Sequence, residues 1–323
     1  MCTSITYKTK DAYFGRTLDI ECSYGEEVIV TPRNFALDFR HTGAQKSHYA
    51  IIGMGTVRDG YPLYYDAANE HGLGMAGLRF ADNACYFPPA QGKVNVAAFE
   101  FIPWLLGHCK SVSEARELLS VVNLCNTPFS KDLPPAPLHW MLSDKYESIV
   151  VESTKNGLQV YENPVGVLTN NPPFPYHMLH LCDYMALSNE PPTAHLGGSY
   201  LAPYSRGMGA MGLPGDFSSA SRFVRAAFVR QNSVSSFDEM SSVSQFFHIL
   251  GAVEHIRGCV RLADGKYEIT AYTSCINLFR GIYYYTTYEN RAISAVNLRK
   301  CDLESMELRR FSLLMEQKIE WQN

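Results

Sequence analysis

The sequence has no long hydrophobic run, and no apolar stretch approaches the roughly 18 residues that a membrane-spanning helix needs. It also has no basic stripe: the formal net charge is −4, and lysine and arginine are scattered along the chain. Nucleic acid is therefore not indicated as a partner. The start of the chain shows no basic segment followed by an apolar one, so we expect a cytoplasmic protein without a membrane span.

Paired cysteines are also missing. The nine cysteines are an odd number without CxxC pairs or regular spacing, which indicates reduced thiols and argues against a disulfide framework or a zinc site. The ten histidines form no ligand cluster. His177 and His180 lie three residues apart without a third ligand, so we interpret them as surface or packing residues. We expect no metal site.

A regular alternation of strands and helices is absent too. With 323 residues, of which 46% are hydrophobic, the chain can bury a substantial core as one large domain or two closely packed ones. The patterns follow the order strands, two helices, strands, two helices, strands. That order disfavours a doubly wound parallel sheet and favours an α+β fold, a four-layer αββα sandwich of mainly antiparallel sheets.

The helices are expected at 95–109, interrupted by Pro103, and after a capping box of Ser111 and Glu114, with apolar positions continuing to Val122. Two more are expected at 218–231 and 236–253, the last with an apolar stripe of Met240, Val243, Phe247 and Leu250. Strand patterns cover 2–8, 12–19, 26–35, 48–57, 61–70, 72–80, 138–144, 147–154, 157–163, 165–170, 267–279, 281–289 and 291–298. Residues 172–215 read as a long loop, with 199–216 as a lid candidate.

Cys2 directly follows Met1, and a side chain this small normally permits removal of the methionine. Cys2 would then carry both a thiol and a free α-amine, and that amine can accept the thiol proton near neutral pH. This combination is the logic of N-terminal nucleophile hydrolases. An unreactive strand cysteine is the simpler alternative, while a lipid-anchored cysteine would need an apolar segment upstream.

The residues after Cys2 favour the catalytic interpretation. Residues 2–8 and 12–19 alternate well enough to pair as a hairpin around Lys10 and Asp11, which brings Arg16 and Asp19 back beside Cys2. A cation near a thiol lowers its pKa, and a carboxylate can orient an amine.

Three further stretches allow two interpretations each. The small residues of 67–78 form a structural turn or present the backbone N–H of Arg79 to a reacting carbonyl. Asn170 is a turn former or a donor to an oxyanion. The loop 126–137 is long enough to suggest function; its Phe129 and Leu133 either line an apolar pocket or hold the loop down.

The motifs MCTSITY, FGRTLD, NEHGLGMAGL, LHWMLSD, GVLTNNP, GLPGDFSSASRFVR and YYYTTYEN occur in an order and at intervals that resemble the choloylglycine hydrolase family of N-terminal nucleophile hydrolases. The chain is most similar to the conjugated bile salt hydrolases of gut bacteria, with penicillin V acylases as close relatives. The resemblance covers nearly the whole chain and implies one domain over 2–323, the four-layer fold and a homotetramer. One motif departs from the family: GLRF stands where GLNF is common, which puts the Arg79 side-chain contacts in doubt.

The resemblance also implies the site. Its catalytic residues would be Cys2, Arg16, Asp19, Asn170 and Arg222, with an oxyanion hole made by Asn170 and the backbone N–H of Arg79. Substrate-binding positions would be Leu18, Tyr65, Arg79, Phe129, Leu133 and Arg206.

The expected reaction is hydrolysis of the amide bond in taurine- and glycine-conjugated bile acids through a Cys2 thioester, without metal or organic cofactor. The Arg206 guanidinium, in the run Ser205–Gly209, could pair with the sulfonate of taurine or with the carboxylate of glycine. The Ser-Arg version of this loop resembles the taurine-preferring type of bile salt hydrolase, and this resemblance implies a taurine preference. A surface arginine is the alternative there. Penicillin V acylase is the competing enzyme, and a catalytically inactive bile-salt-binding relative is the competing binding protein.

Overall fold

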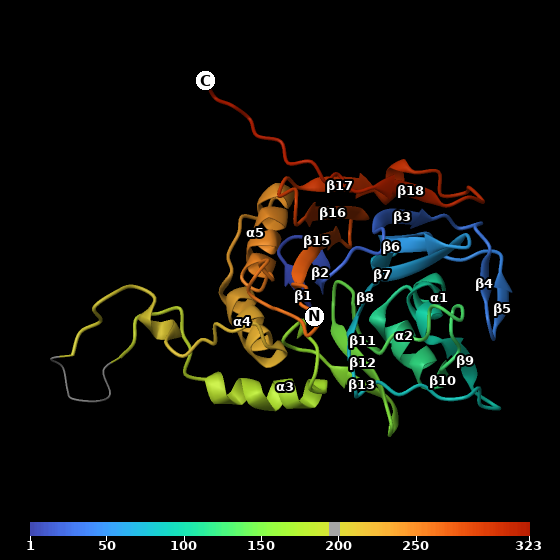
Figure 1. Ribbon diagram of the computed structural model, residues 1–323, viewed down its shortest axis with the longest axis horizontal. Coiled ribbons are helices and arrows are strands. Elements are labelled where there is room, and N and C mark those ends of the chain that lie inside the picture. Colours follow the sequence, from blue (N-terminus) through green and yellow to red (C-terminus); the bar gives the residue numbers. More distant parts are fainter. Residues whose placement is uncertain (194–200) are drawn as a thin grey trace.

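Two antiparallel sheets lie face to face between two layers of helices in a computed structural model of the chain, which describes residues 1–193 and 201–323 (Figure 1). The first sheet has six strands in the order β14-β1-β2-β15-β16-β17. Its strands are β1 (Cys2–Lys8), β2 (Ala12–Ile20), β14 (Val167–Leu168), β15 (Ile269–Asn277), β16 (Ile282–Thr287) and β17 (Ser294–Asn297).

The second sheet has eight strands in the order β13-β12-β11-β8-β7-β6-β3-β18. They are β3 (Glu27–Thr31), β6 (Ile51–Arg58), β7 (Tyr61–Asn69), β8 (Gly74–Arg79), β11 (Leu138–Ser143), β12 (Ser148–Thr154), β13 (Gly157–Glu162) and β18 (Arg309–Ser312). Two small pairs accompany it: β4 (Leu37–Phe39) with β5 (Gly43–Gln45), and β9 (Val94–Ala97) with β10 (Val122–Cys125).

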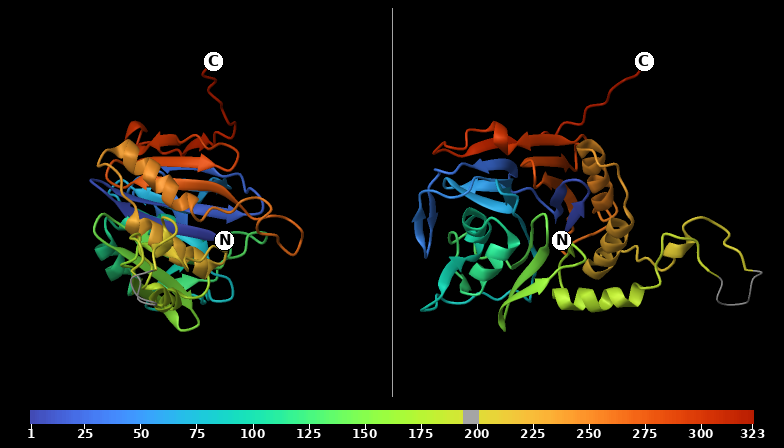
Figure 2. Two further views of the ribbon diagram at one scale, coloured as in Figure 1. Left: turned by 90° about the vertical axis from the view of Figure 1, so that its left-hand side faces the viewer. Right: turned by 180° about the vertical axis from the view of Figure 1, so that it is seen from behind.

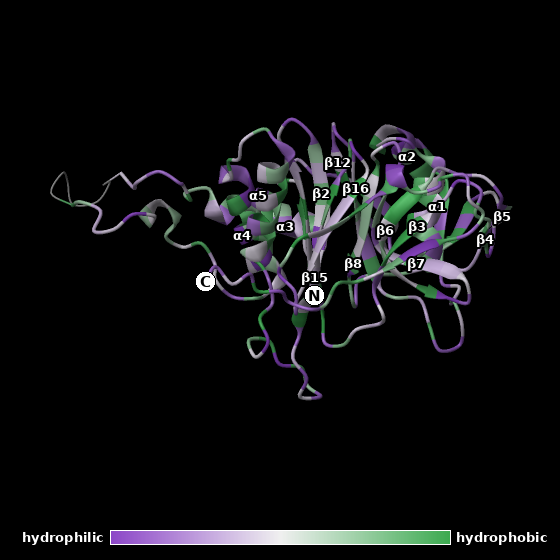
Figure 3. Ribbon diagram, turned by 90° about the horizontal axis from the view of Figure 1, so that it is seen from above, coloured by the Kyte–Doolittle hydropathy of each residue, from purple (hydrophilic) through white to green (hydrophobic). Residues whose placement is uncertain are grey.

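The helices form the outer layers, as the views from the side and from above show (Figures 2 and 3). The α4 (Ser219–Asn232) and α5 (Glu239–Gly251) helices cover the six-stranded sheet, and α1 (Phe101–His108) and α2 (Val112–Leu119) cover the other. The α3 helix (Phe174–Leu181) lies below α4, and short 3₁₀ turns occupy Ala98–Glu100, Cys182–Tyr184, Met208–Ala210 and Leu298–Lys300. The expected four-layer α+β fold is confirmed.

The core has two parts that follow from these layers. One cluster fills the space between the sheets and beneath α4 and α5, with Phe14, Met54 and Phe246 among its buried members. The second lies between the eight-stranded sheet and α1 and α2, with Trp104 and Trp140. Alternating side chains of the eight-stranded sheet belong to one cluster or the other, as the period of two predicts, whereas both faces of the six-stranded sheet belong to the first cluster.

Several sequence predictions need correction. The segment 95–109 is not helical throughout: Val94–Ala97 form a strand because they pair in parallel with Val122–Cys125, and only Phe101–His108 are α-helical. Pro103 does not interrupt that helix, because it lies in the first turn, where its missing N–H has no helical partner. Val122 belongs to β10 rather than to the end of α2.

The long-loop prediction for 172–215 missed the helix α3, which begins with a proline in its first turn. The stripe on α5 is also shifted, because Met240 is 70% exposed whereas Val243, Phe246, Ile249 and Leu250 are buried. The lid candidate 199–216 lies partly outside the described residues. Its described part belongs to a segment that projects from the body beyond α3 and α4 (Figures 1 and 2).

Within the described ranges, no helix has the length and apolar character needed to cross a membrane. The same ranges contain no group of three or more metal-ligating side chains placed to hold an ion. All nine cysteines are free thiols.

Candidate active site

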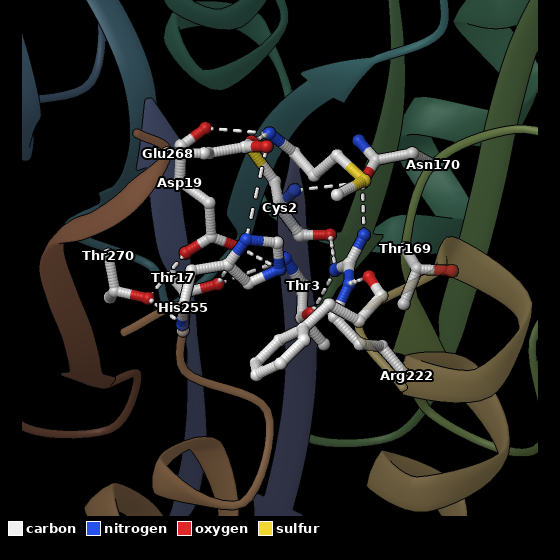
Figure 4. A network of polar contacts seen from close by, with 12 residues as sticks. Cys2, Thr3, Thr17, Asp19, Thr169, Asn170, Arg222, His255, Glu268 and Thr270 are labelled. Atoms are coloured by element: carbon white, nitrogen blue, oxygen red, sulfur yellow. Dashed lines mark hydrogen bonds and ion pairs between the residues drawn. The ribbon is translucent and has the colours of Figure 1, made fainter. Parts of the chain in front are cut away.

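Cys2 begins β1, which lies between β14 and β2 in the six-stranded sheet, and only 4% of the surface of Cys2 is exposed. The predicted hairpin is confirmed, with Cys2 opposite Leu18 and Ser4 opposite Arg16. On the other side β14 pairs Leu168 with Ser4, so Asn170 arrives next to Cys2. The Cys2 backbone N–H donates to Asn170 Oδ1 over 2.8 Å (Figure 4). Two segments distant in the sequence thus meet at the nucleophile candidate.

Arg222 fixes the positions of these two residues. It lies in the first turn of α4, is completely buried, and donates from Nη2 to Asn170 Oδ1 over 2.7 Å. Its Nη1 donates to the Cys2 carbonyl over 2.7 Å and to Thr3 Oγ1 over 2.6 Å (Figure 4). Burial lowers the pKa of Arg222, while Asp19 and Cys2 oppose this shift. Because Asn170 Oδ1 accepts from both Cys2 and Arg222, the amide NH₂ of Asn170 must face away from them.

That NH₂ group faces the end of β8. Asn170 Nδ2 donates to the carbonyl of Arg79 over 2.8 Å. Phe80 N–H bonds to Pro137 O on the β11 side, so by the alternation of antiparallel ladders the neighbouring N–H of Arg79 points away from β11. The N–H and C=O of Arg79 therefore lie on the same side as Asn170. This places the two predicted oxyanion donors next to each other.

Arg16 and Asp19 lie on opposite faces of β2. Arg16 shares the face of Cys2 and Leu18 and reaches the second sheet, where its Nη1 donates to the carbonyls of Tyr65 and Gly77. The ladder between β7 and β8 ends at the pair of Asp66 and Ala76, so the guanidinium lies where those strands separate. Burial lowers the pKa of Arg16, but nearby groups, Cys2 first among them, outweigh it and raise the pKa above the ordinary value.

Asp19 faces the helical layer instead. Its carboxylate accepts from Thr17 Oγ1 over 3.0 Å and from Thr270 Oγ1 over 2.6 Å (Figure 4). A β-bulge in β15 places Thr270 opposite Asp19, because the register shifts between Thr270 and Tyr272. The ring of His255 lies beside this carboxylate, with Nε2 3.9 Å from Asp19 Oδ2. The arrangement can orient an amine at the start of β1.

Comparison with known proteins identifies the family of this chain. The model of the linear amide C–N hydrolases, choloylglycine hydrolase family, matches residues 2–311. The chain belongs to the choloylglycine hydrolase family. A bile salt hydrolase/transferase of Lactiplantibacillus plantarum is 52% identical over 98% of both chains, and one of Clostridium perfringens is 41% identical over 96% of both.

Solved structures show the same family fold. The C2A mutant of the conjugated bile acid hydrolase from Clostridium perfringens superposes with a TM-score of 0.93 over 100% of both chains, at 40% identity. A penicillin V acylase from Agrobacterium tumefaciens shares the fold with a TM-score of 0.74 at 20% identity, covering 96% of this chain and 91% of that one. The resemblance seen in the sequence motifs is confirmed.

The predicted substrate positions are spread more widely over the chain than the predicted catalytic residues are. Leu18 is buried opposite Cys2, and Tyr65 packs against the inter-sheet core. Phe129 packs its ring against Phe99, with centroids 5.2 Å apart, and its N–H bonds to the carbonyl of Leu133. Leu133 is 40% exposed. Both loop interpretations therefore stay open for Phe129 and Leu133.

The Arg79 and Arg206 side chains are exposed. Arg206 belongs to the segment that projects away from Cys2 in a single chain (Figure 1). A cavity of about 470 Å³ lies between α2, β10 and β13, and none of the predicted site residues lines it. Their roles in binding stay predictions.

The residues that bind the backbone of Asn170 and fix its position were not identified from the sequence. Its N–H donates to Ser219 Oγ over 2.8 Å, and its carbonyl accepts from His177 Nε2 over 2.8 Å. The His177 ring is buried and stacks on Phe223, 4.8 Å between centroids. Burial lowers the pKa of His177 to about 4, so the ring is neutral with its proton on Nε2. The three-residue spacing to His180 suggested packing, but nothing in the sequence connected His177 to Asn170.

Replacing His177 with phenylalanine keeps the stacking and removes the hydrogen bond to Asn170. We expect kcat to fall about tenfold with KM unchanged, because a displaced donor weakens transition-state binding only. Steady-state kinetics measures this split. His180→Phe, on the same helix with its side chain partly exposed, is the matched control. A change in KM alone would contradict a positioning role.

Two buried imidazoles also predict how stability depends on pH. Burial lowers the pKa of both His177 and His255 to about 4, whereas an unfolded histidine titrates near 6.5. Between these values the unfolded chain binds more protons, so the free energy of unfolding should fall as pH drops from about 6.5 to about 4. Denaturant unfolding at several pH values measures how steeply the free energy of unfolding changes with pH. This slope reports the number of protons taken up on unfolding, and His177→Phe should reduce that number by up to one. An unchanged slope in that variant would rule out the contribution of His177.

Proposed function

We propose that this chain hydrolyses the amide bond of conjugated bile acids through a thioester on Cys2. The observation that carries the proposal is the convergence of Cys2, Asn170 and Arg222 from three separate elements on one hydrogen-bonded site. Support for the substrate class comes from the whole-chain similarity to proteins named bile salt hydrolase/transferase and conjugated bile acid hydrolase. The amino acid released would be taurine or glycine.

The proposed reaction begins once Met1 has been removed. The nitrogen of Cys2 that now donates to Asn170 Oδ1 becomes an α-amine, which accepts the thiol proton. The thiolate attacks the substrate carbonyl, and the oxyanion binds to the remaining N–H of Asn170 Nδ2 and to the Arg79 N–H. The buried charge of Arg16 supports the anionic sulfur, and the carboxylate of Asp19 orients the amine.

Collapse of the tetrahedral intermediate breaks the amide C–N bond. The protonated α-amine of Cys2 gives its proton to the leaving nitrogen, so taurine or glycine departs as an amine. The same amine then accepts a proton from water, which attacks the thioester and releases the bile acid with the thiol restored. No metal or organic cofactor takes part in the proposed reaction.

Assays with paired conjugates test the substrate. Taurocholate and glycocholate should be hydrolysed faster than penicillin V, and the reverse order would make the chain a penicillin V acylase. Intact-mass analysis of the purified protein separates a third possibility. Protein that retains Met1 and binds bile salts without turnover would be the inactive binding relative.

Arg206 carries the proposed taurine preference. It projects away from Cys2 in a single chain, so a contact with substrate requires a second copy or a rearranged segment (Figure 1). We expect Arg206→Ala to lower kcat/KM for taurocholate severalfold more than for glycocholate, because the run Ser205–Gly209 resembles the loop of taurine-preferring bile salt hydrolases and its guanidinium can pair with the sulfonate. Arg309→Ala, an exposed arginine on β18, is the control. An equal loss on both substrates would remove Arg206 from specificity.

The proposal extends to the assembly and location of the protein. A homotetramer is supported by the projecting segment, which exposes Leu201, Tyr204 and Met211 as apolar contact candidates. One domain over 2–323 is supported by a core cluster that draws residues from both sheets. A cytoplasmic location is supported by nine free cysteines. Light scattering of the purified protein tests the tetramer.

A further inference from the structure

Met1 occupies a specific site at the end of β1. Its carbonyl accepts from the Asp19 N–H over 2.9 Å, and its ammonium donates to the Asp19 carbonyl over 2.7 Å. The ammonium also forms an ion pair with Glu268, which is only 4% exposed (Figure 4). Met1 thus extends the β1–β2 ladder by one residue, and its positive end meets a buried carboxylate.

Removal of Met1 leaves these partners without their bonds. The N–H and C=O of Asp19 lose their acceptor and donor in a region where Asp19 is 1% exposed. Glu268 loses the ammonium, and the ring of His255 stays beside it, with Nδ1 3.9 Å from the Glu268 carboxylate. Buried polar groups left unpaired cost free energy. The processed protein therefore has a polar notch whose donors and acceptors are already in place.

His255 adds an independent observation at the same place. Its side chain is completely buried between Asp19 and Glu268, yet neither ring nitrogen has a hydrogen-bond partner among the residues that the structure describes. Both carboxylates lie beyond direct hydrogen-bond distance, at 3.9 Å. An unpaired imidazole aimed at the notch is available to a ligand or to a bridging water.

We propose that the notch left by Met1 binds a free α-amino acid as a zwitterion. Its ammonium takes the place of the Met1 ammonium at Glu268 and the Asp19 carbonyl. Its carboxylate accepts from the Asp19 N–H and pairs with the α-ammonium of Cys2. Glycine, the amino acid that glycine conjugates release, has these groups, and methionine is the residue that the site already holds.

The geometry requires a free ligand to lie farther out than Met1 does. In the chain the Met1 carbonyl carbon is bonded to the Cys2 nitrogen, whereas a carboxylate oxygen paired with an ammonium stays about 2.8 Å away. The side chain of Met1 is 31% exposed, so the notch opens toward solvent on its outer side. The ligand has room to shift in that direction.

A bound amino acid ties up the α-amine of Cys2. That amine is the base in the proposed reaction, so the occupied site inhibits hydrolysis; this consequence rests on the proposed function. Binding itself does not depend on turnover, because it needs only the processed start of the chain, Asp19 and Glu268. Amino-acid binding in the notch and the proposed hydrolysis reaction can therefore be disproved separately.

Calorimetric titration of the processed full-length protein tests the site, with complete Met1 removal checked by intact mass. L-methionine should bind saturably at one site per chain, and glycine should compete for it. N-acetyl-L-methionine, which lacks the ammonium, and L-methioninamide, which lacks the carboxylate, should each bind at least tenfold more weakly. Equal binding of either analogue, or no binding of L-methionine, would overturn the proposal.

Variants locate the site. Glu268→Gln should weaken L-methionine binding about tenfold or more, while Glu289→Gln, a half-exposed carboxylate that pairs with Arg257, should not change it. Wild-type protein purified with Met1 retained should not bind, because Met1 fills the notch. Binding by the Met1-retaining protein would overturn the proposal. Thermal unfolding checks that Glu268→Gln is folded, and the comparison of ligands in the wild-type chain stands without it.

Discussion

Replacing Cys2 with alanine is expected to lower kcat for conjugated bile salts by about 10⁴-fold or more. The variant keeps the processed amine, the Asn170 contact and the Arg222 clamp, but it has no sulfur to form the thioester. The fold should survive because the change removes a single atom from the core cluster to which Cys2 belongs. Steady-state rates measure the loss, and intact mass after rapid quenching shows whether an acyl adduct still forms.

The matched control is Cys109→Ala. Cys109 is as buried as Cys2, at 2% exposed, but it belongs to the other core cluster beside α1 and α2. Burial also raises the pKa of its thiol to about 12, so it carries no thiolate at neutral pH. Its removal should leave kcat unchanged. Residual activity of the Cys2 variant within tenfold of wild type would exclude a thioester on this residue.

The hairpin that begins at Cys2 could be predicted because the sequence pattern that determines it lies within the hairpin itself. Alternation of apolar and polar residues over 2–8 and 12–19 fixes the pairing, and the pairing fixes that Arg16 and Leu18 share the face of Cys2. Most strands of the two large sheets and the helices α1, α2, α4 and α5 were predicted from the same periodicities. The fold class followed from their order.

The rest depends on contacts between distant segments, which no local pattern encodes. Asn170 reaches Cys2 only because the two-residue strand β14 pairs with β1. Thr270 reaches Asp19 only because β15 contains a bulge. Glu268, just before β15, reaches Met1 only when β15 is in place. The short parallel pair of β9 and β10 likewise makes a strand of residues that were expected to be helical. Tertiary pairing overrides local preference at each of these places.

Asp66 is the clearest example of a residue whose contacts could not be predicted from the sequence. It is completely buried between the sheets and accepts hydrogen bonds from Tyr272, Tyr283 and Ser274. Burial raises the pKa of its carboxyl, and the positive charge of Arg16 opposes this shift. In the sequence it stands in an apolar strand, where an aspartate carries no sign of a role. Its partners come from β15 and β16, more than two hundred residues later.

Asn170→Ala is expected to lower kcat by about 10²–10³-fold, which corresponds to about 2.7–4 kcal/mol for a lost oxyanion donor. The amide does two things here: Nδ2 faces the Arg79 backbone, and Oδ1 accepts from Cys2 and Arg222. Alanine removes the donor and also leaves the Arg222 Nη2 without this acceptor. Both effects act on the transition state or on the position of Cys2, so kcat should fall more than KM rises.

Asn163→Ala separates catalysis from stability. Asn163 has the same 4% exposure as Asn170, and its side-chain amide bonds only to backbone, donating to the Val167 carbonyl and accepting from the Gly166 N–H. Its loss should lower the free energy of unfolding by about 1–3 kcal/mol and leave kcat unchanged. Asn170→Asp refines the test, because aspartate keeps the acceptor for Arg222 but cannot donate to the oxyanion. If Asn170→Asp hydrolyses taurocholate at the wild-type rate, the side chain of residue 170 is an anchor for Cys2 and the oxyanion is stabilised elsewhere.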